Sequence, residues 1–271
     1  VKQGFSGKIY AIAATKDIVE VALLDAAGIA QEKTGPIIYT KDEVLRVCDL
    51  IEPVSYDVPL NISSFTALFR NAGHILGSAS VEITADSKTI VFSGDLGNIA
   101  DSLIQPKEYI SKANFVVMES TYGDKLHPKE NPEDVLQQEI REIEKSGGAL
   151  LIPAFSIERS QEIIHRLGHL RKDNKISNSI PIFLDSPMAI EVMEIFKKYP
   201  KLYSNELAHD KSPFAFPNLI LTDSAQKSKS ILESKGAKII IAGSGMMSGG
   251  RILHHIYNYI SNPTTRILIV G

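Results

Sequence analysis

Two short segments carry a histidine and an aspartate between glycines, and these residue types can hold a metal ion. His74 lies in Gly73-His74-Ile75-Leu76-Gly77-Ser78, and Asp95 follows an apolar run in Ser93-Gly94-Asp95. Glycine permits unusual dihedrals and close backbone approach, which lets a loop direct a side chain at a metal. Taken singly, His74 equally fits a turn, and Asp95 fits an Asx-turn. Together, on neighbouring loops joined by a hairpin, the two residues predict one shared site.

Two small-residue turns in the second half precede expected helices and can receive a phosphate. The turn of residues 244–250 begins with Ser244 and Gly245 and leads to Arg251, and the turn of residues 155–157 leads towards Arg159. Free amides at a helix N-terminus attract anions, and arginine adds a bidentate contact. Helix capping explains each turn equally well when it is taken alone. Neither turn has the lysine or the spacing of a nucleotide-binding loop.

The histidine pairs of the second half are interpreted as structural. His165 and His169 are four residues apart and share one face of an expected helix. A zinc-protease helix would need glutamate at the position of Arg166, so a surface or packing pair is favoured. His254 and His255 are adjacent and diverge on a helix. We expect one of these two to pack and the other to face a cleft.

The composition is that of an ordinary globular protein. The 271 residues are 44% hydrophobic and 23% charged, with a formal net charge of −3. Residues 1–119 carry 10 basic and 15 acidic side chains, whereas residues 120–271 carry 19 and 17, so the second half is favoured for a polyanion. The single cysteine, Cys48, excludes disulfides within the chain and cysteine-rich zinc modules. No apolar run approaches the roughly 20 residues of a membrane span, so we expect a cytoplasmic protein without a membrane partner.

The two halves of the chain show different secondary-structure patterns. The first half predicts helices at residues 18–27 and 42–50, the earlier one capped near Thr15 and Asp17, and strands at residues 8–13, 65–70, 80–84 and 89–92. The second half predicts strands at residues 115–118, 149–152, 180–184, 219–221, 238–242 and 267–270, most of them separated by helices. Such alternation indicates a doubly wound parallel sheet, which binds ligands beyond the carboxyl ends of its strands.

The chain resembles the metallo-β-lactamase superfamily, in its β-CASP nuclease branch, over nearly its whole length. Besides the His74 and Asp95 segments, the motifs that carry this resemblance are Met118-Glu119-Ser120-Thr121, Pro153-Ala154-Phe155, Asp185-Ser186-Pro187-Met188-Ala189 and Gly243-Ser244-Gly245-Met246. The RNA-processing members are the most similar. The resemblance implies an α/β protein: a partial metallo-β-lactamase αββα domain over residues 1–123, followed by a β-CASP insert with a mostly parallel sheet over residues 124–271.

The same resemblance assigns roles to single residues. It implies that His74 binds one of two zinc ions and that Asp95 bridges both, and imidazole and carboxylate are ordinary zinc ligands. It implies that Glu119 acts with Asp95 in catalysis by orienting a metal-bound histidine; a glutamate that caps a strand end is the alternative. The expected contacts to RNA phosphates are Arg159, Ser244, Gly245 and Arg251.

The chain departs from the family pattern in its metal ligands. The superfamily signature histidine-x-histidine-x-aspartate-histidine is absent, and so are the two histidines that follow the insert in this branch. We expect a piece of a longer protein, cut at both ends; a degenerate, metal-free relative is the rival explanation. With two expected ligands, this stretch alone is expected to be inactive and to bind zinc poorly.

The resemblance implies a zinc-dependent RNA phosphodiesterase, acting as an endoribonuclease, a 5′-exoribonuclease or both. A metal-bound hydroxide would attack phosphorus while the insert grips the phosphates of single-stranded RNA. One alternative is a catalytically inactive RNA-binding scaffold of the same branch. Another is a metallo-β-lactamase-fold hydrolase of small molecules, which would need no such insert. A homodimer is among the expected assemblies.

Overall fold

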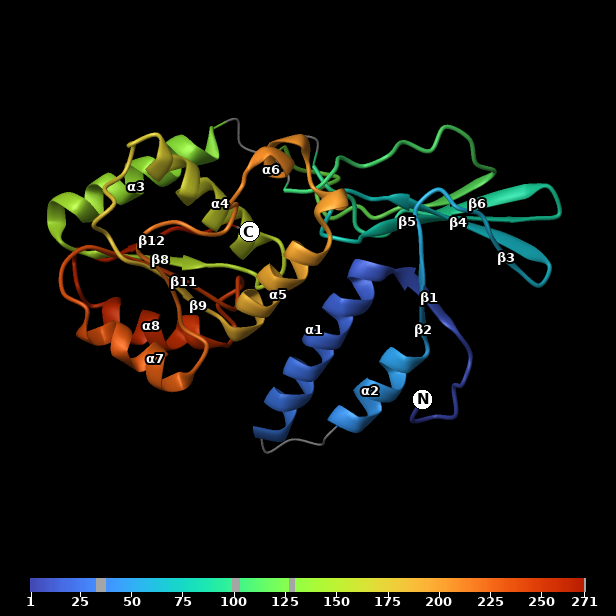
Figure 1. Cartoon of the computed structure of the whole chain (residues 1–271), viewed down its shortest axis with the longest axis horizontal. Helices are drawn as coiled ribbons and strands as arrows, with labels where there is room; N and C mark the ends of the chain where they lie inside the picture. Colours follow the sequence, from blue (N-terminus) through green and yellow to red (C-terminus); the bar gives the residue numbers. More distant parts are fainter. Residues whose placement is uncertain (33–37, 99–102, 127–129, 271) are drawn as a thin grey trace. The chain divides into compact units, whose positions relative to one another are not determined.

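The structure, a computed structural model, describes residues 1–32, 38–98, 103–126 and 130–270 and confirms the α/β class (Figure 1). The chain divides into two compact units, Val1–Lys125 with Ile195–His209, and Leu126–Glu194 with Asp210–Gly271. The sequence pattern placed one division after residue 123. It did not predict that residues 195–209 belong with the first unit.

The first unit contains a five-stranded sheet, a two-stranded sheet and flanking helices. In the larger sheet the order is β3-β4-β5-β6-β7, antiparallel except between β6 and β7; in the smaller one β1 pairs with β2 in parallel. The elements are β1 (Ile9–Ile12), α1 (Ala13–Glu32), α2 (Lys41–Asp49), β2 (Ile51–Val54), β3 (Leu60–Ile62), β4 (Phe65–Asn71), β5 (Ala79–Ala85), β6 (Lys88–Phe92), β7 (Phe115–Val117), the 3₁₀ helix η1 (Pro200–Leu202) and α6 (Asn205–His209).

Local sequence accounts for several of these boundaries. Thr40 and Glu43 form a reciprocal capping box that starts α2, because each side chain satisfies a backbone N–H of the other. Asp86 and Ser87 both have positive φ and make the tight turn between β5 and β6. The expected cap at Thr15 was wrong: α1 already begins at Ala13, and the Thr15 hydroxyl donates to the Gly77 carbonyl oxygen at 2.6 Å.

The second unit is built on a five-stranded sheet with the order β10-β9-β11-β8-β12, in which every pair is parallel. Its elements are α3 (Pro132–Ser146), β8 (Ala149–Pro153), α4 (Arg159–Lys172), β9 (Ile182–Asp185), α5 (Pro187–Lys198), β10 (Leu219–Leu221), α7 (Ala225–Ser230), the 3₁₀ helix η2 (Ile231–Glu233), β11 (Lys238–Ala242), α8 (Arg251–Tyr259) and β12 (Arg266–Ile267). The last four residues of α5, from Ile195, belong to the first unit.

Helices cover both faces of this parallel sheet. Every residue of β8, β9 and β11 is buried, as expected of central strands in a doubly wound sheet. Figure 1 shows α3 and α4 on one face and α7 and α8 on the other. On the second face Ile252 of α8 and Ile231 of η2 pack against Leu151 and Ile240 of the strands. The sheet therefore presents its strand ends, rather than its faces, to solvent.

One predicted strand was placed in the wrong sheet. The run at residues 115–118 was expected with the parallel strands of the second half, but β7 extends the sheet of the first unit, in parallel with β6. Its residues are exposed, whereas those of β8, β9 and β11 are buried. An apolar run of three or four residues has the same pattern in either setting, so periodicity could not separate the two.

The described residues contain no candidate for a membrane-spanning helix, because none of their helices combines the necessary length with sufficient hydropathy.

A buried carboxylate at the end of β9 holds the second unit's strand-end loops together. Asp185 is fully buried and accepts hydrogen bonds from Thr222, Ser228, Arg251 and the Nε2–H of His255, at 2.6 to 2.7 Å. Burial by itself would raise the pKa of Asp185, but these donors outweigh it and lower the pKa from 3.8 to about 2. The charged form is therefore the stable one in the folded protein.

Replacing the Asp185 carboxylate should lower the stability of the folded protein. In Asp185→Asn the bonds from Arg251 and His255 lose their charged acceptor, and we expect the free energy of unfolding at pH 7 to fall by about 3 kcal/mol in denaturant titrations. Asp223→Asn is the matched control: it removes an exposed pair with Lys227 and should leave the free energy of unfolding close to that of the parent.

The lowered pKa of Asp185 predicts that the free energy of unfolding depends on pH. Because the folded pKa lies below the unfolded one, the stability contributed by Asp185 is complete above about pH 4 and is lost as the pH falls towards 2. The parent protein should lose this component over that range, and Asp185→Asn should not. Equal stability of parent and variant at pH 7 would show that the cluster is not a stabilising element.

Candidate active site

The loop that carries His74 joins β4 to β5 and is held by its own polar groups. The Ser78 hydroxyl oxygen accepts the N–H groups of His74 at 3.0 Å and Ile75 at 3.2 Å, and the Asn71 side-chain oxygen accepts that of Gly73 at 2.9 Å. Gly73 has a φ of +62°, which a side chain would strain. The loop thereby fixes the position from which the imidazole projects.

The loop that carries Asp95 follows β6 and makes close backbone contacts with the His74 loop. The Gly97 N–H donates to the Ala72 carbonyl oxygen at 2.9 Å. A Cβ at Gly97 would lie 1.5 Å from the Gly73 carbonyl oxygen, so no side chain fits there. Glycine is therefore required at Gly97 for this close approach.

These two loops bring His74 and Asp95 together, as the glycine-flanked segments predicted. The His74 Nε2 lies 3.9 Å from the Asp95 Oδ2, and both side chains are well exposed. An imidazole nitrogen and a carboxylate oxygen are zinc donors, and two donors of one tetrahedral zinc lie about 3.4 Å apart, so the pair fits a metal ion after a small side-chain shift. That they bind metal stays a prediction. Among the described residues, no third His, Cys, Asp or Glu completes a ligand group with them.

Glu119 forms hydrogen bonds with the residues on either side of the Gly94-Asp95 segment. Its two carboxylate oxygens accept the N–H groups of Leu96 at 2.9 Å and Thr121 at 3.1 Å, and its own N–H donates to the Ser93 hydroxyl oxygen at 3.0 Å. The bond from Leu96, followed by those from Thr121, lowers the pKa of Glu119. Glu119 therefore positions the residue next to Asp95. The further role of orienting a metal-bound histidine stays a prediction.

The predicted phosphate contacts lie at the strand ends of the second unit. The Ser156 and Ser186 hydroxyls are 2.9 Å apart, and a Cβ at Gly245 would lie 2.9 Å from the Phe155 ring, so the loops after β8, β9 and β11 are neighbours. Within the 244–250 turn, the Ser244 hydroxyl oxygen accepts the Ser248 N–H at 3.2 Å. Part of this turn's hydrogen-bonding capacity is therefore used internally.

The two predicted arginines have partners within the unit. Arg251 donates through Nη1 to Asp185 and to the Thr222 carbonyl oxygen, at 2.7 and 2.8 Å. Arg159 donates through Nη1 to Glu162 at 2.6 Å, and its side chain is 41% exposed. Arg251 thus has a structural task that the sequence did not reveal. Their contacts with RNA stay predictions.

Two supporting residues of the first unit were missed in the sequence. Ser93 links the end of β6 to Glu119, and the Lys107 ammonium donates to the Gly97 carbonyl oxygen at 2.7 Å. Ser93 lies within the Ser-Gly-Asp segment, so its position was a usable signal. Lys107 lies ten residues from Gly97, without a local pattern to mark it.

Loss of the Glu119 carboxylate should loosen the Asp95 loop. In Glu119→Gln, one of the two acceptor oxygens becomes an amide donor, so we expect faster hydrogen exchange at the Leu96 or Thr121 amide, measured by NMR. Glu52→Gln is the control, because Glu52 is an exposed carboxylate on β2 paired with Lys8. Unchanged exchange at both amides would remove Glu119 from its positioning role.

Comparison with known proteins adds two findings. Residues 160–271 match the family model described as the Beta-Casp domain. Ribonuclease TTHA0252 of Thermus thermophilus is 33% identical over 281 residues, which cover 100% of this chain and 62% of that relative. RNase aCSPSF2 of Saccharolobus solfataricus is 29% identical, with 97% of this chain and 51% of the relative covered.

A eukaryotic protein is similar over the same region. Cleavage and polyadenylation specificity factor 73 of Drosophila melanogaster is 26% identical, with 100% of this chain and 40% of that relative covered. The chain thus spans less than two thirds of each of these relatives, which are ribonucleases or RNA-processing proteins by name. Both findings agree with the motifs that resemble the β-CASP branch of the metallo-β-lactamase superfamily, and residues 160–271 carry its Beta-Casp domain.

Proposed function

We propose that the protein containing this chain is a metal-dependent RNA phosphodiesterase. The observation that carries the proposal is the His74–Asp95 pair, with its donor atoms 3.9 Å apart on two loops joined by backbone contact. The relatives named as ribonucleases support RNA as the substrate. The choice between endonuclease and 5′-exonuclease action depends on how the RNA end is held, and both belong to the proposal.

Within this proposal, His74 and Asp95 hold the metal, and Glu119 keeps Asp95 in place. When bound, two zinc ions would supply an activated water and stabilise the charge that develops on the phosphoryl group. The exposure of both side chains leaves room for a phosphodiester and for further ligands. Glu119 acts through the Leu96 amide rather than on the substrate, so it is a positioning residue.

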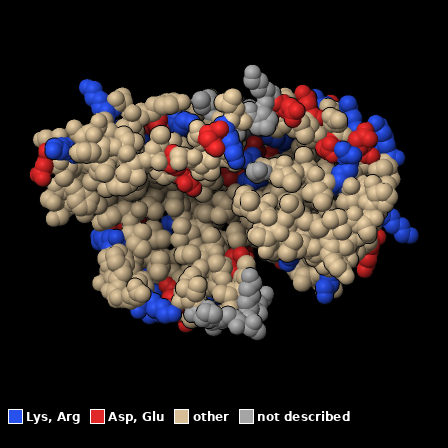
Figure 2. Space-filling view, turned by 180° about the vertical axis from the view of Figure 1, so that it is seen from behind, with Lys and Arg blue, Asp and Glu red and all other residues tan. Residues whose placement is uncertain are grey.

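We further propose that the RNA phosphates contact Arg159, Ser244, Gly245 and Arg251. All four lie at or just after the carboxyl ends of parallel strands, where such sheets bind ligands. The bonds of Arg251 to Asp185 and Thr222 use Nη1, and Nη2 is the atom proposed to reach a phosphate. On the face drawn in Figure 2, basic and acidic side chains are interspersed rather than gathered by sign. The expected RNA contacts are therefore local.

A catalytically inactive RNA-binding scaffold is the second candidate. It is favoured by one observation: among the described residues, no third ligand joins His74 and Asp95. Both candidates predict RNA binding, and only the first predicts cleavage. The test must therefore separate cleavage from affinity.

Asp95→Asn and His74→Ala should each lower RNA cleavage by the whole protein at least about 100-fold, because each removes a metal ligand. RNA affinity, measured by fluorescence anisotropy, should remain that of the parent. Asp86→Asn is the matched control, since Asp86 lies in the turn at the other end of the β5–β6 hairpin. Parent-like cleavage in both ligand variants would reject the proposed site, and a parent protein that binds RNA without cleaving it would favour the scaffold.

Arg159→Ala should weaken binding about equally across RNA sequences. Loss of one phosphate contact should make the slope of log affinity against log salt shallower by about 0.7, since single-stranded nucleic acid releases fewer counterions than duplex. Arg141→Ala, which removes an exposed arginine of α3, is the control and should keep the parental slope. A parental slope in Arg159→Ala would leave Arg159 as a partner of Glu162 only.

A further inference from the structure

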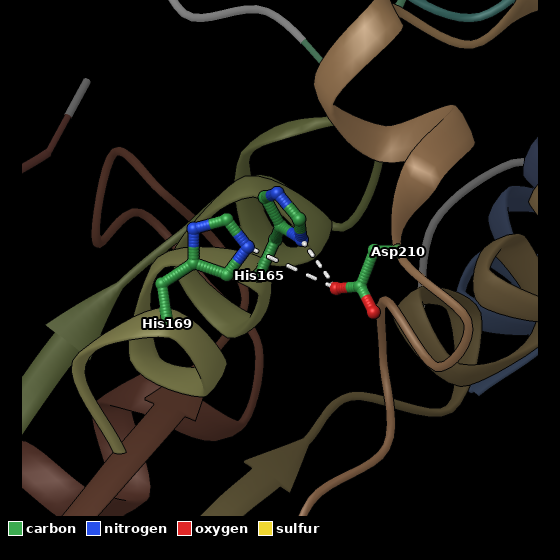
Figure 3. Close-up of side chains that lie close together, drawn as sticks. All are labelled: His165, His169 and Asp210. Carbon is green, nitrogen blue, oxygen red and sulfur yellow. Dashed lines mark ion pairs between the residues drawn. The ribbon is translucent and has the colours of Figure 1, made fainter. Parts of the chain in front are cut away.

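One face of α4 carries two histidines that the proposed function does not use. His165 and His169 are one helical turn apart, and their ring centroids are 4.2 Å apart. Their spacing alone favoured a surface or packing pair. The structure adds a third donor, because Asp210, 41 residues after His169, reaches the same point (Figure 3). All three residues belong to the second unit.

The distances in this cluster suit a shared ion better than direct hydrogen bonds. The Asp210 Oδ2 lies 3.7 Å from the His165 Nδ1 and 3.8 Å from the His169 Nε2, and all three donor atoms lie within 4.8 Å of one another. Both distances exceed a normal hydrogen bond. They are within half an ångström of the roughly 3.4 Å between two donors of one tetrahedral zinc. Figure 3 shows both imidazoles turned towards the same carboxylate oxygen.

The segment that carries Asp210 is held against α4 independently of the cluster. The second Asp210 oxygen, Oδ1, accepts the Ser212 N–H at 2.9 Å, which leaves Oδ2 for the histidines. Further along, Phe216 packs on Gly168, where a Cβ would lie 3.1 Å from its ring, and Arg171 donates to the Pro217 carbonyl oxygen. The donors are therefore positioned before any ion binds.

Burial and charge also suit a cation. His165 is 5% exposed, and the side chains of His169 and Asp210 are 27% and 24% exposed, so the donors are largely withdrawn from water. Two neutral imidazoles and one carboxylate present a single negative charge to a dication. Without an ion, the His165 Nδ1–H donates a long hydrogen bond to the Pro213 carbonyl oxygen at 3.4 Å, and metal binding through Nδ1 would replace this bond.

We propose that His165, His169 and Asp210 bind one divalent transition-metal ion, with zinc as the best match to two imidazoles and a carboxylate. The ion ties residues 210–217 to α4. It is separate from the metal pair proposed for RNA cleavage, whose ligands His74 and Asp95 lie in the first unit. Arg166 stands where a zinc protease has its general base, so the role is to hold structure rather than to hydrolyse.

The test is the zinc content of the whole protein, measured by elemental analysis after dialysis against micromolar zinc. His169→Gln and Asp210→Asn should each contain one zinc per molecule less than the parent. Their affinity for that ion should fall more than about 100-fold, because loss of a ligand costs more than loss of a ligand's support. His254→Gln, an exposed histidine of α8, is the control and should keep the parental content.

Two further measurements keep the result interpretable. Cobalt substitution should give the intense visible absorption of a tetrahedral site in the parent and weaker absorption in both variants. RNA cleavage should be unchanged, since the cluster lies outside the proposed active site. Asp210→Asn keeps an oxygen that can accept the Ser212 N–H, so it preserves the local turn. Parental zinc content and cobalt spectra in both variants would overturn the proposal and leave the cluster an ion-pair contact.

Discussion

The contact between the backbones of Gly97 and Gly73 is the constraint on which the proposed active site depends. The two loops leave different strand ends, β6 and β4, and a single methyl group at Gly97 would meet the Gly73 carbonyl oxygen at 1.5 Å. This approach, with the Gly97 N–H bonded to Ala72, sets the distance between the imidazole of His74 and the carboxylate of Asp95. Glu119, through the Leu96 amide, then limits how far the Asp95 loop can move.

In the second unit, the buried carboxylate of Asp185 holds the loops at the strand ends. These strand-end loops share a common acceptor, Asp185, which takes hydrogen bonds from Thr222, Ser228, Arg251 and His255. A fully buried carboxylate is tolerated because every one of these donors points at it. The arrangement places the 155–157 and 244–250 turns side by side, which the proposed phosphate contacts require.

The parallel sheet was largely predictable from the sequence, because buried strands read as apolar runs between helices. Five of the six predicted runs form it; β7 was misplaced because exposure, which distinguishes it, leaves no trace in so short a run. The His74–Asp95 pair was predictable as well, since glycines mark both loops. Asp210 was not, because it lies 41 residues from His169 and only the folded chain brings the two together. The structural task of Arg251 was hidden for the same reason.

The geometry of the loops does not by itself identify RNA as the substrate; that part of the proposal depends on sequence similarity to ribonucleases. Similarity to named ribonucleases supports the proposed class of chemistry, whereas the loops, the Asp185 cluster and the Glu119 bonds explain how this chain would support it. The α4 cluster lies outside that scheme. The metal ion that we propose there would be held by residues that lie outside the motifs quoted for the resemblance.

The most direct measurement is RNA cleavage by Gly97→Ala, compared with Gly28→Ala. A Cβ at Gly28 meets no heavy atom within 4 Å, so that variant should cleave RNA like the parent. Gly97→Ala must push the Asp95 loop away from the His74 loop, and we expect its cleavage to fall as far as that of a variant lacking the Asp95 carboxylate, with the second unit's stability unchanged. Parental cleavage by Gly97→Ala would contradict the account, because the two loops would then not need their backbone contact.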